Sequence, residues 1–440
     1  MSNESPAVVP DHVLTPHARP IQPLPVTKDG KQFVGLRDPS MLVSQSMVVN
    51  PQALNLVQQF QGVHTIKEIA AKFLPADRLP EGADREDHLQ RLAEEITKLA
   101  TTMDSFGLLW GPTFHEFERQ RMEQLEKQGA FPVQASGSLV AFARGKDPDH
   151  SEPPSDPKDQ ETWARELAIG QLDLWLEESE DPEFEVSPVG IVVPHLDYAR
   201  GGELSASAYR AWVDQPSPAR IVVLGTNHFG MGDGVVASPH GFQTPLGRVS
   251  ADEGVWTKMH ARLGDRLFKD QLDLVPEHSI EIHLPWIQHL FGDVPVVAAL
   301  IPDPMTPMIS DDGGRVTAAE FTTALKDVLG EEGGKTYFIS SADLSHVGPQ
   351  FGEPKPVDDH RREEIERHDR EMMTHFLTND GTSFIEAMEW SKNSTRWCSI
   401  GNMCAVAELA QADHIELVDY RQACDDKGTG LVSAAVLAFL

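Results

Sequence analysis

Apolar residues in the first quarter of the chain recur at the three- and four-residue spacing of amphipathic helices. Residues 50–62 (NPQALNLVQQFQG) place leucine, valine and phenylalanine on one stripe. Thr65 and Glu68 have the spacing of a capping box ahead of a second stripe, and a third stripe spans residues 89–103. The pattern therefore predicts a small helical or winged-helix module over residues 29–115.

The residues on either side of this module are predicted to be less regular. Residues 1–28 carry six prolines, which predicts an extended or disordered tail. Residues 116–160 begin as a charged helical stretch and continue into RGKDPDHSEPPSDPKDQE, which predicts a linker helix followed by a Pro/Asp-rich surface loop. The remaining residues, 161–440, are then expected to form a separate domain.

From residue 161 onward, apolar runs typical of buried strands alternate with stretches typical of helices. The expected strands are residues 190–194, 220–224, 294–302, 336–346, 415–422 and 430–440, with a hairpin near 238–247. The expected helices are residues 163–176, 204–212, 252–263 and 316–330. This alternation predicts an α/β fold in which a central, mostly parallel sheet carries helices on both faces.

Composition limits the partners and the location of the protein. The 440 residues include 37 basic and 68 acidic side chains, which give a formal charge of −31. This charge repels phosphate backbones and no basic patch offsets it, so nucleic acid is not an expected partner. No stretch reaches the roughly 18 apolar residues of a membrane span and no signal pattern is seen, so a cytoplasmic location without membrane contact is expected. Three cysteines do not resemble a disulfide framework.

Three apolar strands each run into a histidine: His195 follows IVVP, His228 follows IVVLGTN and His346 follows YFISSADLS. In an α/β sheet, ligands bind outside the carboxyl ends of the strands, so three imidazoles placed there can bind one metal ion. The alternative is that each histidine is a polar turn residue. The repeated order of strand and histidine favours a shared metal site.

Cys398 and Asp343 extend this candidate site. Cys398 lies beside the expected start of a small-residue helix, where the helix dipole favours a thiolate that binds metal or acts as a nucleophile. Asp343 precedes His346 by three residues and is placed to orient an imidazole or to move a proton. The simpler alternatives are a buried small hydrophobe for Cys398 and a turn former for Asp343.

The segment PEHSIEIHLPWIQHLF, residues 276–291, contributes further candidates. His278 and His283 are separated by about 140° on a helix, so they lie on different faces and do not form a His-x-x-x-His zinc motif. Pro285 places Glu277 and His278 at or before the first turn of a helix. There Glu277 is stabilised as an anion and can support a ligand or exchange a proton, although a plain helix cap is the alternative.

Six segments, in their order and spacing, resemble the Memo family, which includes the proteins called AmmeMemoRadiSam system protein B. They are VPHLDYARGG, VLGTNH, TPLGRVSAD, EHSIEIHLPWIQ, SSADLSHVG and RWCSIGN. The resemblance covers about residues 131–440 and implies a fold like that of the class III extradiol ring-cleavage dioxygenases. It also implies a metal pocket of three histidines and a cysteine, which fall on His195, His228, His346 and Cys398.

Two departures from the family pattern concern the pocket. The usual Pro-His-Ala-Gly-Tyr is Pro-His-Leu-Asp-Tyr, which adds Asp197 beside Tyr198, and the usual Gly-Pro-Ser-His is Gly-Thr-Asn-His, which adds Asn227. We expect these residues, together with His283, to shape a more polar pocket. Residues 33–110 resemble a PqqD-like winged helix through their hydrophobic spacing, which implies a peptide or protein partner.

The donor set suits iron or copper, and also zinc, but not magnesium or calcium. If iron or copper keeps an open position, the resemblance implies oxygen-linked chemistry on a small molecule or peptide, as in a non-haem metal-dependent oxidoreductase. His278, Glu277 and Asp343 would then move protons. A non-enzymatic metal-handling or redox protein that binds a partner through its N-terminal module is the alternative. A closed structural zinc site is a third interpretation.

Overall fold

The computed structural model describes residues 9–43, 45–74, 84–146, 152–230, 233–306 and 314–440. The chain divides into two compact units, Met1–Lys127 and Gln128–Leu440, and each is described by itself. The sequence analysis ended the first module at residue 115 and began the second domain at residue 161. Part of the predicted loop, residues 147–151, lies outside the described residues.

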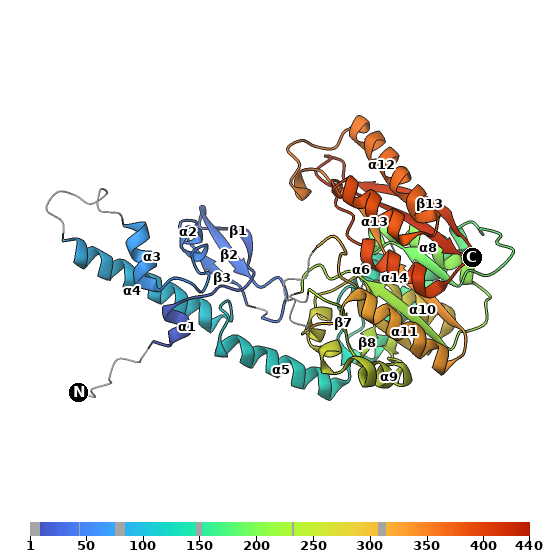
Figure 1. Cartoon of the computed structure of the whole chain (residues 1–440), viewed down its shortest axis with the longest axis horizontal. Helices are drawn as coiled ribbons and strands as arrows, with labels where there is room; N and C mark the ends of the chain where they lie inside the picture. Colours follow the sequence, from blue (N-terminus) through green and yellow to red (C-terminus); the bar gives the residue numbers. More distant parts are fainter. Residues whose placement is uncertain (1–8, 44, 75–83, 147–151, 231–232, 307–313) are drawn as a thin grey trace. The chain divides into compact units, whose positions relative to one another are not determined.

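The first unit combines helices with a small antiparallel sheet in the order β1-β2-β3 (Figure 1). Its strands are β1 (Gln22–Lys28), β2 (Lys31–Arg37) and β3 (Met47–Val49). Its helices are α1 (Asp11–Leu14), α2 (Ala53–Val57), α3 (Ile66–Phe73), α4 (Arg85–Ser105) and α5 (Pro112–Gln128). The predicted capping box of Thr65 and Glu68 is present at the start of α3 and is confirmed.

The prediction of a disordered tail to residue 28 is wrong for residues 9–28, while residues 1–8 lie outside the described part of the chain. Val13 of α1 is buried in the apolar core of the unit, and β1 pairs with β2 along its whole length. β1 is an edge strand, where its two prolines are tolerated because one side of the strand needs no hydrogen bonds. The proline content therefore led to a prediction of disorder where the chain forms a strand.

A buried ion pair joins separate segments of the first unit. The guanidinium of Arg19 donates to both carboxylate oxygens of Asp38 at 3.2 Å and to the carbonyl of Gly107 at 2.8 Å. It also lies 3.5 Å from the centre of the Phe114 ring. Both charged residues are almost fully buried, so each depends on the other for compensation of its charge.

The second unit is built on a mixed sheet in the order β12-β14-β5-β11-β6-β10-β7, with β13 pairing β14. The strands are β5 (Gly190–Val193), β6 (Arg220–Gly225), β7 (Val236–Ala237), β10 (Val296–Leu300), β11 (Thr336–Ser341), β12 (Asp343–Val347), β13 (Ile415–Cys424) and β14 (Leu431–Phe439). The central strands β5, β11, β6 and β10 are parallel, and the flanking strands are antiparallel. The α/β prediction is thus confirmed, with a parallel centre and antiparallel margins.

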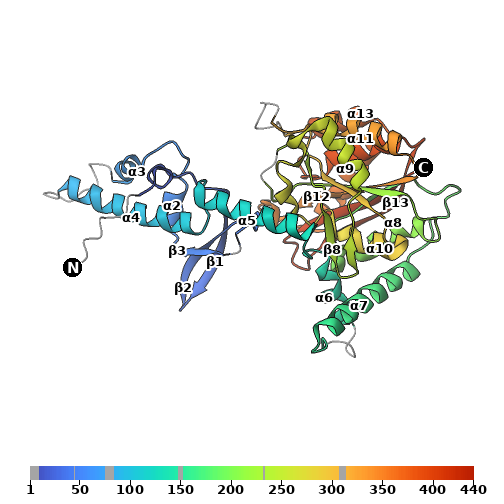
Figure 2. The ribbon, with the colours of Figure 1, turned by 90° about the horizontal axis from the view of Figure 1, so that it is seen from below.

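Helices cover both faces of this sheet, and Figure 2 shows α9, α11 and α13 on the opposite side from α6, α7, α8 and α10. The first group, with α12 and α14, is α9 (Glu253–Leu263), α11 (Ala318–Glu332), α12 (Asp359–Leu377), α13 (Gly381–Trp390) and α14 (Ile400–Ala410). The second group is α6 (Gly137–Lys146), α7 (Pro157–Glu178), α8 (Tyr198–Tyr209) and α10 (Leu284–Phe291). Within the described residues, every helix is too short or too polar to span a bilayer.

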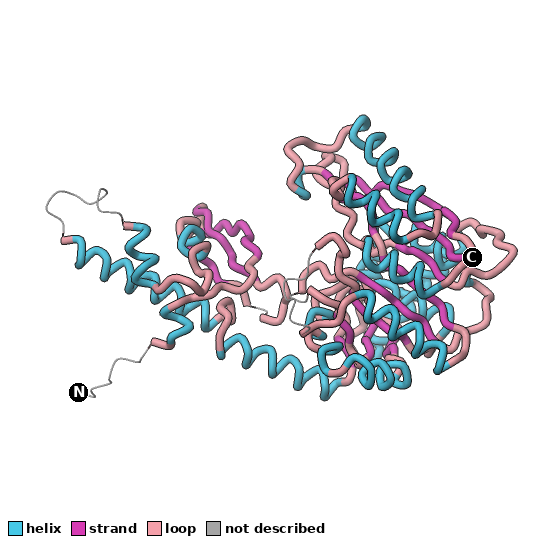
Figure 3. Tube along the Cα trace, viewed as in Figure 1, coloured by secondary structure: helices cyan, strands magenta, loops and turns pink. Residues whose placement is uncertain are grey.

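Two local features refine the predicted elements, and Figure 3 follows helices and strands along the chain. The predicted hairpin is present as β8 (Gly241–Thr244) and β9 (Gly247–Val249), which pair with each other, and β8 also pairs with β4 (Ala130–Phe131). The predicted single strand 336–346 is wrong, because β11 ends at Ser341 and β12 starts at Asp343. His346 consequently lies on an antiparallel strand and not at the end of a parallel one.

A buried carboxylate ties residues 134–136 to the rest of the second unit. Glu281 accepts hydrogen bonds from the backbone N–H groups of Gln134, Ala135 and Ser136 at 2.8, 3.0 and 3.1 Å, and from the Ser136 hydroxyl. Burial raises the pKa of Glu281, and these donors act against that rise. Glu281 is three residues from His278, so this contact lies close to the candidate site.

We expect Gly202→Ala to destabilise the second unit by about 1–3 kcal/mol, because a Cβ atom cannot fit there without displacing a packed ring. That atom would lie 2.4 Å from Cζ2 of the buried Trp175. Gly170→Ala in α7 is the matched control, since nothing lies within 4 Å of its Cβ position, and we expect it to stabilise the helix by roughly 0.5–1 kcal/mol. Urea unfolding of both variants measures the difference, and equal effects would contradict the packing argument.

Candidate metal centre

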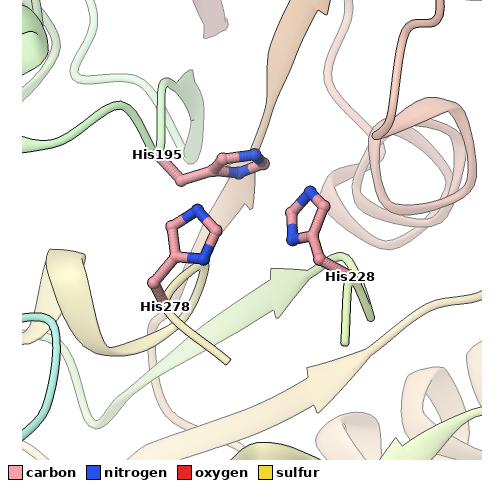
Figure 4. Close-up of side chains that lie close together, drawn as sticks. All are labelled: His195, His228 and His278. Atoms are coloured by element: carbon pink, nitrogen blue, oxygen red, sulfur yellow. The ribbon is translucent and has the colours of Figure 1, made fainter. Parts of the chain in front are cut away.

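Three histidine side chains converge beyond the carboxyl ends of the parallel strands β5 and β6. One ligand atom from each of His195, His228 and His278 lies within 4.8 Å of the others. Their ring centres are separated by 4.9, 5.2 and 5.0 Å, and Figure 4 shows the three rings facing a common space. This is a donor group suited to one transition-metal ion.

His195 is held by its backbone and by one ring nitrogen. It lies two residues beyond β5, and its N–H donates to Oδ1 of Asp343 at 3.0 Å. Its Nδ1 is 3.0 Å from the hydroxyl of Ser341 at the end of β11. Since Nδ1 is engaged there, Nε2 remains as the metal-binding nitrogen, and it lies 3.5 Å from the sulfur of Cys398.

Glu277 orients the other two histidines. Its carboxylate accepts from the backbone N–H groups of His228 and His278 at 2.7 and 2.9 Å. The same carboxylate lies 3.1 Å from Nδ1 of His228 and 3.3 Å from Nδ1 of His278. A carboxylate at Nδ1 fixes the tautomer and leaves Nε2 free to bind a metal. Pro285 lies in the first turn of α10, after Glu277 and His278, as predicted.

The electrostatics of the group favour neutral imidazoles at His195 and His278 and a protonated imidazole at His228, beside one buried anion. Burial and neighbouring histidines lower the pKa of His195 well below its ordinary value, and burial is also the main cause that lowers the pKa of His278. For His228, burial acts to lower the pKa, but Cys398 and Glu277 outweigh it and raise the pKa well above its usual value. Glu277 itself is buried, which alone would raise its pKa, yet His228 and His278 lower it to about 2.

Asp343 lies beside the group and holds a proton more readily than an ordinary carboxyl. Its Oδ2 is 3.5 Å from Nε2 of His195. Burial raises the pKa of Asp343 to about 7, although His228 and the backbone N–H of His195 act to lower it. A buried carboxyl in this position is suited to exchange a proton near neutral pH.

Cys398 and His346 lie near the three histidines but are not members of that group. The Cys398 sulfur is within hydrogen-bonding distance of His195, and it lies two residues before α14, as predicted for a thiol at a helix N-terminus. Nδ1 of His346 is 3.0 and 3.1 Å from the carbonyls of Leu344 and Arg396. Burial lowers the pKa of His346 to about 4. The structure thus groups His278 with His195 and His228, where the sequence interpretation placed His346.

The predicted pocket residues make contacts of different kinds. Asp197 is the N-cap of α8 and forms an ion pair with Arg200 at 2.7 Å. The Asn227 amide donates to Asp273 at 2.9 Å, which fixes the loop before His228. The other two predicted residues turn away into the core: the Tyr198 hydroxyl donates to the Ile282 carbonyl at 2.7 Å, and His283 Nδ1 lies 3.0 Å from the Tyr209 hydroxyl. Burial lowers the pKa of His283 to about 3.

Two neighbours of the group were not found from the sequence. Ser341 contacts His195 and ends an apolar strand, which is the same positional signal that identified the histidines. Phe229 directly follows His228, is 41% exposed, and its ring centre lies 5.9 Å from that of His228 and 6.0 Å from that of His278. This exposed aromatic ring, beside two partly buried histidines, forms an apolar border to the site.

A family model for Memo-like proteins matches residues 162–438, which is more than half of the chain. The chain belongs to the Memo family. A MEMO1 family protein of Methanopyrus kandleri is 27% identical over 303 residues, covering 65% of this chain and 95% of the relative. A MEMO1 family protein of Thermotoga neapolitana is 31% identical over 198 residues, covering 45% of this chain and 67% of the relative. The Memo match contains every member of the histidine group, whereas the first unit lies outside it.

Proposed function

We propose that this Memo protein binds one redox-active transition metal, iron or copper, through His195, His228 and His278. The observation that carries the proposal is the convergence of three ligand atoms with a carboxylate behind two of the rings. Mostly neutral imidazoles and a nearby thiol suit iron, copper or zinc and exclude hard, oxygen-preferring cations. His228 must lose its proton when a metal binds, so metal uptake would release protons.

The bound metal would supply redox and Lewis-acid chemistry, and the relation to extradiol dioxygenases that the Memo resemblance implies supports oxygen-linked oxidation of a small molecule or peptide. The protein's own residues would orient and protect the site. Glu277 holds the Nδ1 protons of His228 and His278, and Asp343 holds a proton beside His195. Phe229 would contact the apolar part of a substrate. The non-enzymatic alternative keeps the same metal site without a substrate.

A closed structural zinc site is less well supported by this arrangement. Such a site uses four protein ligands at once. The group contains three, and the nearest additional candidates are Cys398, beside His195, and His346, whose Nδ1 faces two backbone carbonyls. A three-ligand group leaves one position for a small molecule, which is the arrangement of catalytic metal sites.

Metal analysis of protein purified without oxygen, followed by an oxygen-consumption assay, tests the proposal. We expect about one iron or copper ion per chain and oxygen uptake that depends on that metal. Free thiols are expected to survive in the cytoplasm, where we place the protein, so purification in reductant preserves the native state. Stoichiometric zinc without oxygen uptake would contradict the redox proposal, and absence of any bound metal would contradict the metal site.

For the first unit we propose peptide binding by addition of a strand to β3. Support comes from the position of β3 at an edge of the three-stranded sheet and from the 52% exposure of Val48 at its centre. The other edge, β1, carries Pro23 and Pro25, which lack N–H donors. We expect leader peptides encoded near this protein to bind the full chain, and Val48→Asp to weaken that binding. If the wild-type protein and the Val48→Asp variant bind the peptides equally in a fluorescence titration, the proposal is contradicted.

A further inference from the structure

Asp369 is a fully buried carboxylate at the centre of a hydrogen-bond network in the second unit. It lies on α12, and its Oδ1 accepts from the Ser345 hydroxyl at 2.5 Å and from Trp397 Nε1 at 3.0 Å. Its Oδ2 accepts from the Ser433 hydroxyl at 2.5 Å and from the Tyr420 hydroxyl at 2.8 Å. Four donors around one buried carboxylate are an unusual concentration of polar contacts in an apolar core.

The network is arranged around an acceptor. An ionised carboxylate only accepts hydrogen bonds, and Trp397 Nε1 only donates, so the geometry suits the anion. Burial raises the pKa of Asp369, whereas the four donors act to lower it. Among the described residues, no lysine, arginine or histidine forms an ion pair with this carboxylate. Burying an anion that only neutral donors stabilise costs free energy of folding, so we expect the network to have a role besides packing.

Two of the donors sit directly beside residues of the candidate metal centre. Ser345 precedes His346, and Trp397 precedes Cys398. Trp397 Nε1 also lies 3.1 Å from the Ser345 hydroxyl, so both donors meet at the same carboxylate oxygen. One side chain of α12 therefore connects the backbone of β12 to the segment that carries the thiol.

The segment before Cys398 depends on such contacts because it has no regular structure of its own. Residues 391–399 lie between α13 and α14, and Asn393 and Arg396 have left-handed backbone conformations, with φ of 41° and 62°. Non-glycine residues adopt this conformation only where surrounding contacts enforce it. The Trp397 N–H donates to the Asn393 side chain at 2.7 Å, and Trp397 is 2% exposed. Asp369 supplies one of the contacts that join this segment to the rest of the unit, and the His346 N–H, which donates to the Thr395 carbonyl at 2.7 Å, supplies another.

We propose that Asp369 is a positioning residue that holds the Cys398 sulfur against the histidine group, through Trp397, and fixes the backbone of His346 through Ser345. The proposal rests on the metal-binding function proposed above. Of the two other donors, Ser433 on β14 also accepts from the Ser345 N–H at 3.0 Å, whereas Tyr420 on β13 also accepts from the Gln422 side chain at 3.1 Å, away from the site. Removing the hydroxyl of Ser345, which adjoins His346, should therefore displace the Cys398 thiol more than removing the hydroxyl of Tyr420.

Ser345→Ala and Tyr420→Phe form a matched pair, because each removes one hydroxyl donor from the same carboxylate. Asp369→Asn removes the charge itself. The probe is Co²⁺ added to the full-length chain, read by its affinity. We expect Asp369→Asn and Ser345→Ala to weaken Co²⁺ binding roughly 10-fold, because a displaced Cys398 no longer contacts the ligand His195. Tyr420→Phe should leave the affinity unchanged.

A metal-free measurement separates this proposal from the metal site. The rate at which iodoacetamide alkylates Cys398, relative to Cys424 on the same chain, reports how the thiol is held. We expect the rate to rise several-fold in Asp369→Asn and Ser345→Ala and to stay unchanged in Tyr420→Phe. If the wild-type chain binds no Co²⁺ but the alkylation rates differ in this way, the metal proposal fails and the positioning role stands. If all the folded variants alkylate as the wild type does, or if Tyr420→Phe behaves as Ser345→Ala does, the role of Asp369 is structural only.

Discussion

Replacing His195 with alanine is expected to reduce bound metal to the background level while the second unit stays folded. The substitution removes one of three ligands, and loss of a ligand should exceed the roughly 10–100-fold cost of losing an outer contact. His360→Ala is the matched control, because that imidazole is 78% exposed on α12. Metal content by elemental analysis and the far-UV circular dichroism spectrum check the two halves of this prediction. Full metal occupancy in His195→Ala would contradict the site.

A companion pair of variants distinguishes the ligand set in the structure from the one inferred from the sequence. Since His278 shares the group with His195 and His228, we expect His278→Ala to lose more metal than His346→Ala. His346 lies outside that group, and its ring packs at 5.2 Å from that of Phe351, although the carbonyls at its Nδ1 leave its Nε2 free. The reverse order of losses would return the third ligand position to His346.

The second large effect is expected in the first unit, where Asp38→Ala should lower the free energy of unfolding by about 3–5 kcal/mol. The variant leaves the Arg19 guanidinium buried without its charged partner, and burial already lowers the pKa of Arg19. Hydrogen exchange should show loss of protection in residues 9–127 and unchanged protection of the parallel strands of the second unit.

Asp87→Ala is the control for this effect. Its partner Arg91 is largely exposed on α4, and ion pairs in water contribute little to stability. We expect that variant to unfold almost as the wild-type chain does. If Asp38→Ala is equally harmless, the buried pair does not hold the first unit together.

The sequence predicted those parts of the fold and site that depend on local pattern. Hydrophobic alternation identified the parallel strands, and the strand ends led to His195 and His228, which do converge. The capping box of Thr65 and Glu68 was recognisable because it uses residues three positions apart.

The sequence analysis failed where the deciding contact is distant along the chain. The apolar run through residues 336–346 gives no sign that β12 leaves β11 to pair with β14. The position of His278 depends on its packing against His195 and His228, both more than 40 residues away. For the same reason, the interaction of Asp369 with Ser345 and Trp397 is invisible before the chain is folded.

The contact between Glu281 and residues 134–136 bears on how this protein is best shortened. The match to the Memo family model starts at residue 162, but three backbone donors and one hydroxyl for a buried carboxylate come from upstream of that point. A chain trimmed to the matched stretch would remove these four donors from the buried carboxylate of Glu281, which lies three residues from His278. Expression boundaries for the isolated second unit therefore belong near residue 128, where the compact unit begins, so that residues 134–136 stay with the carboxylate that they stabilise.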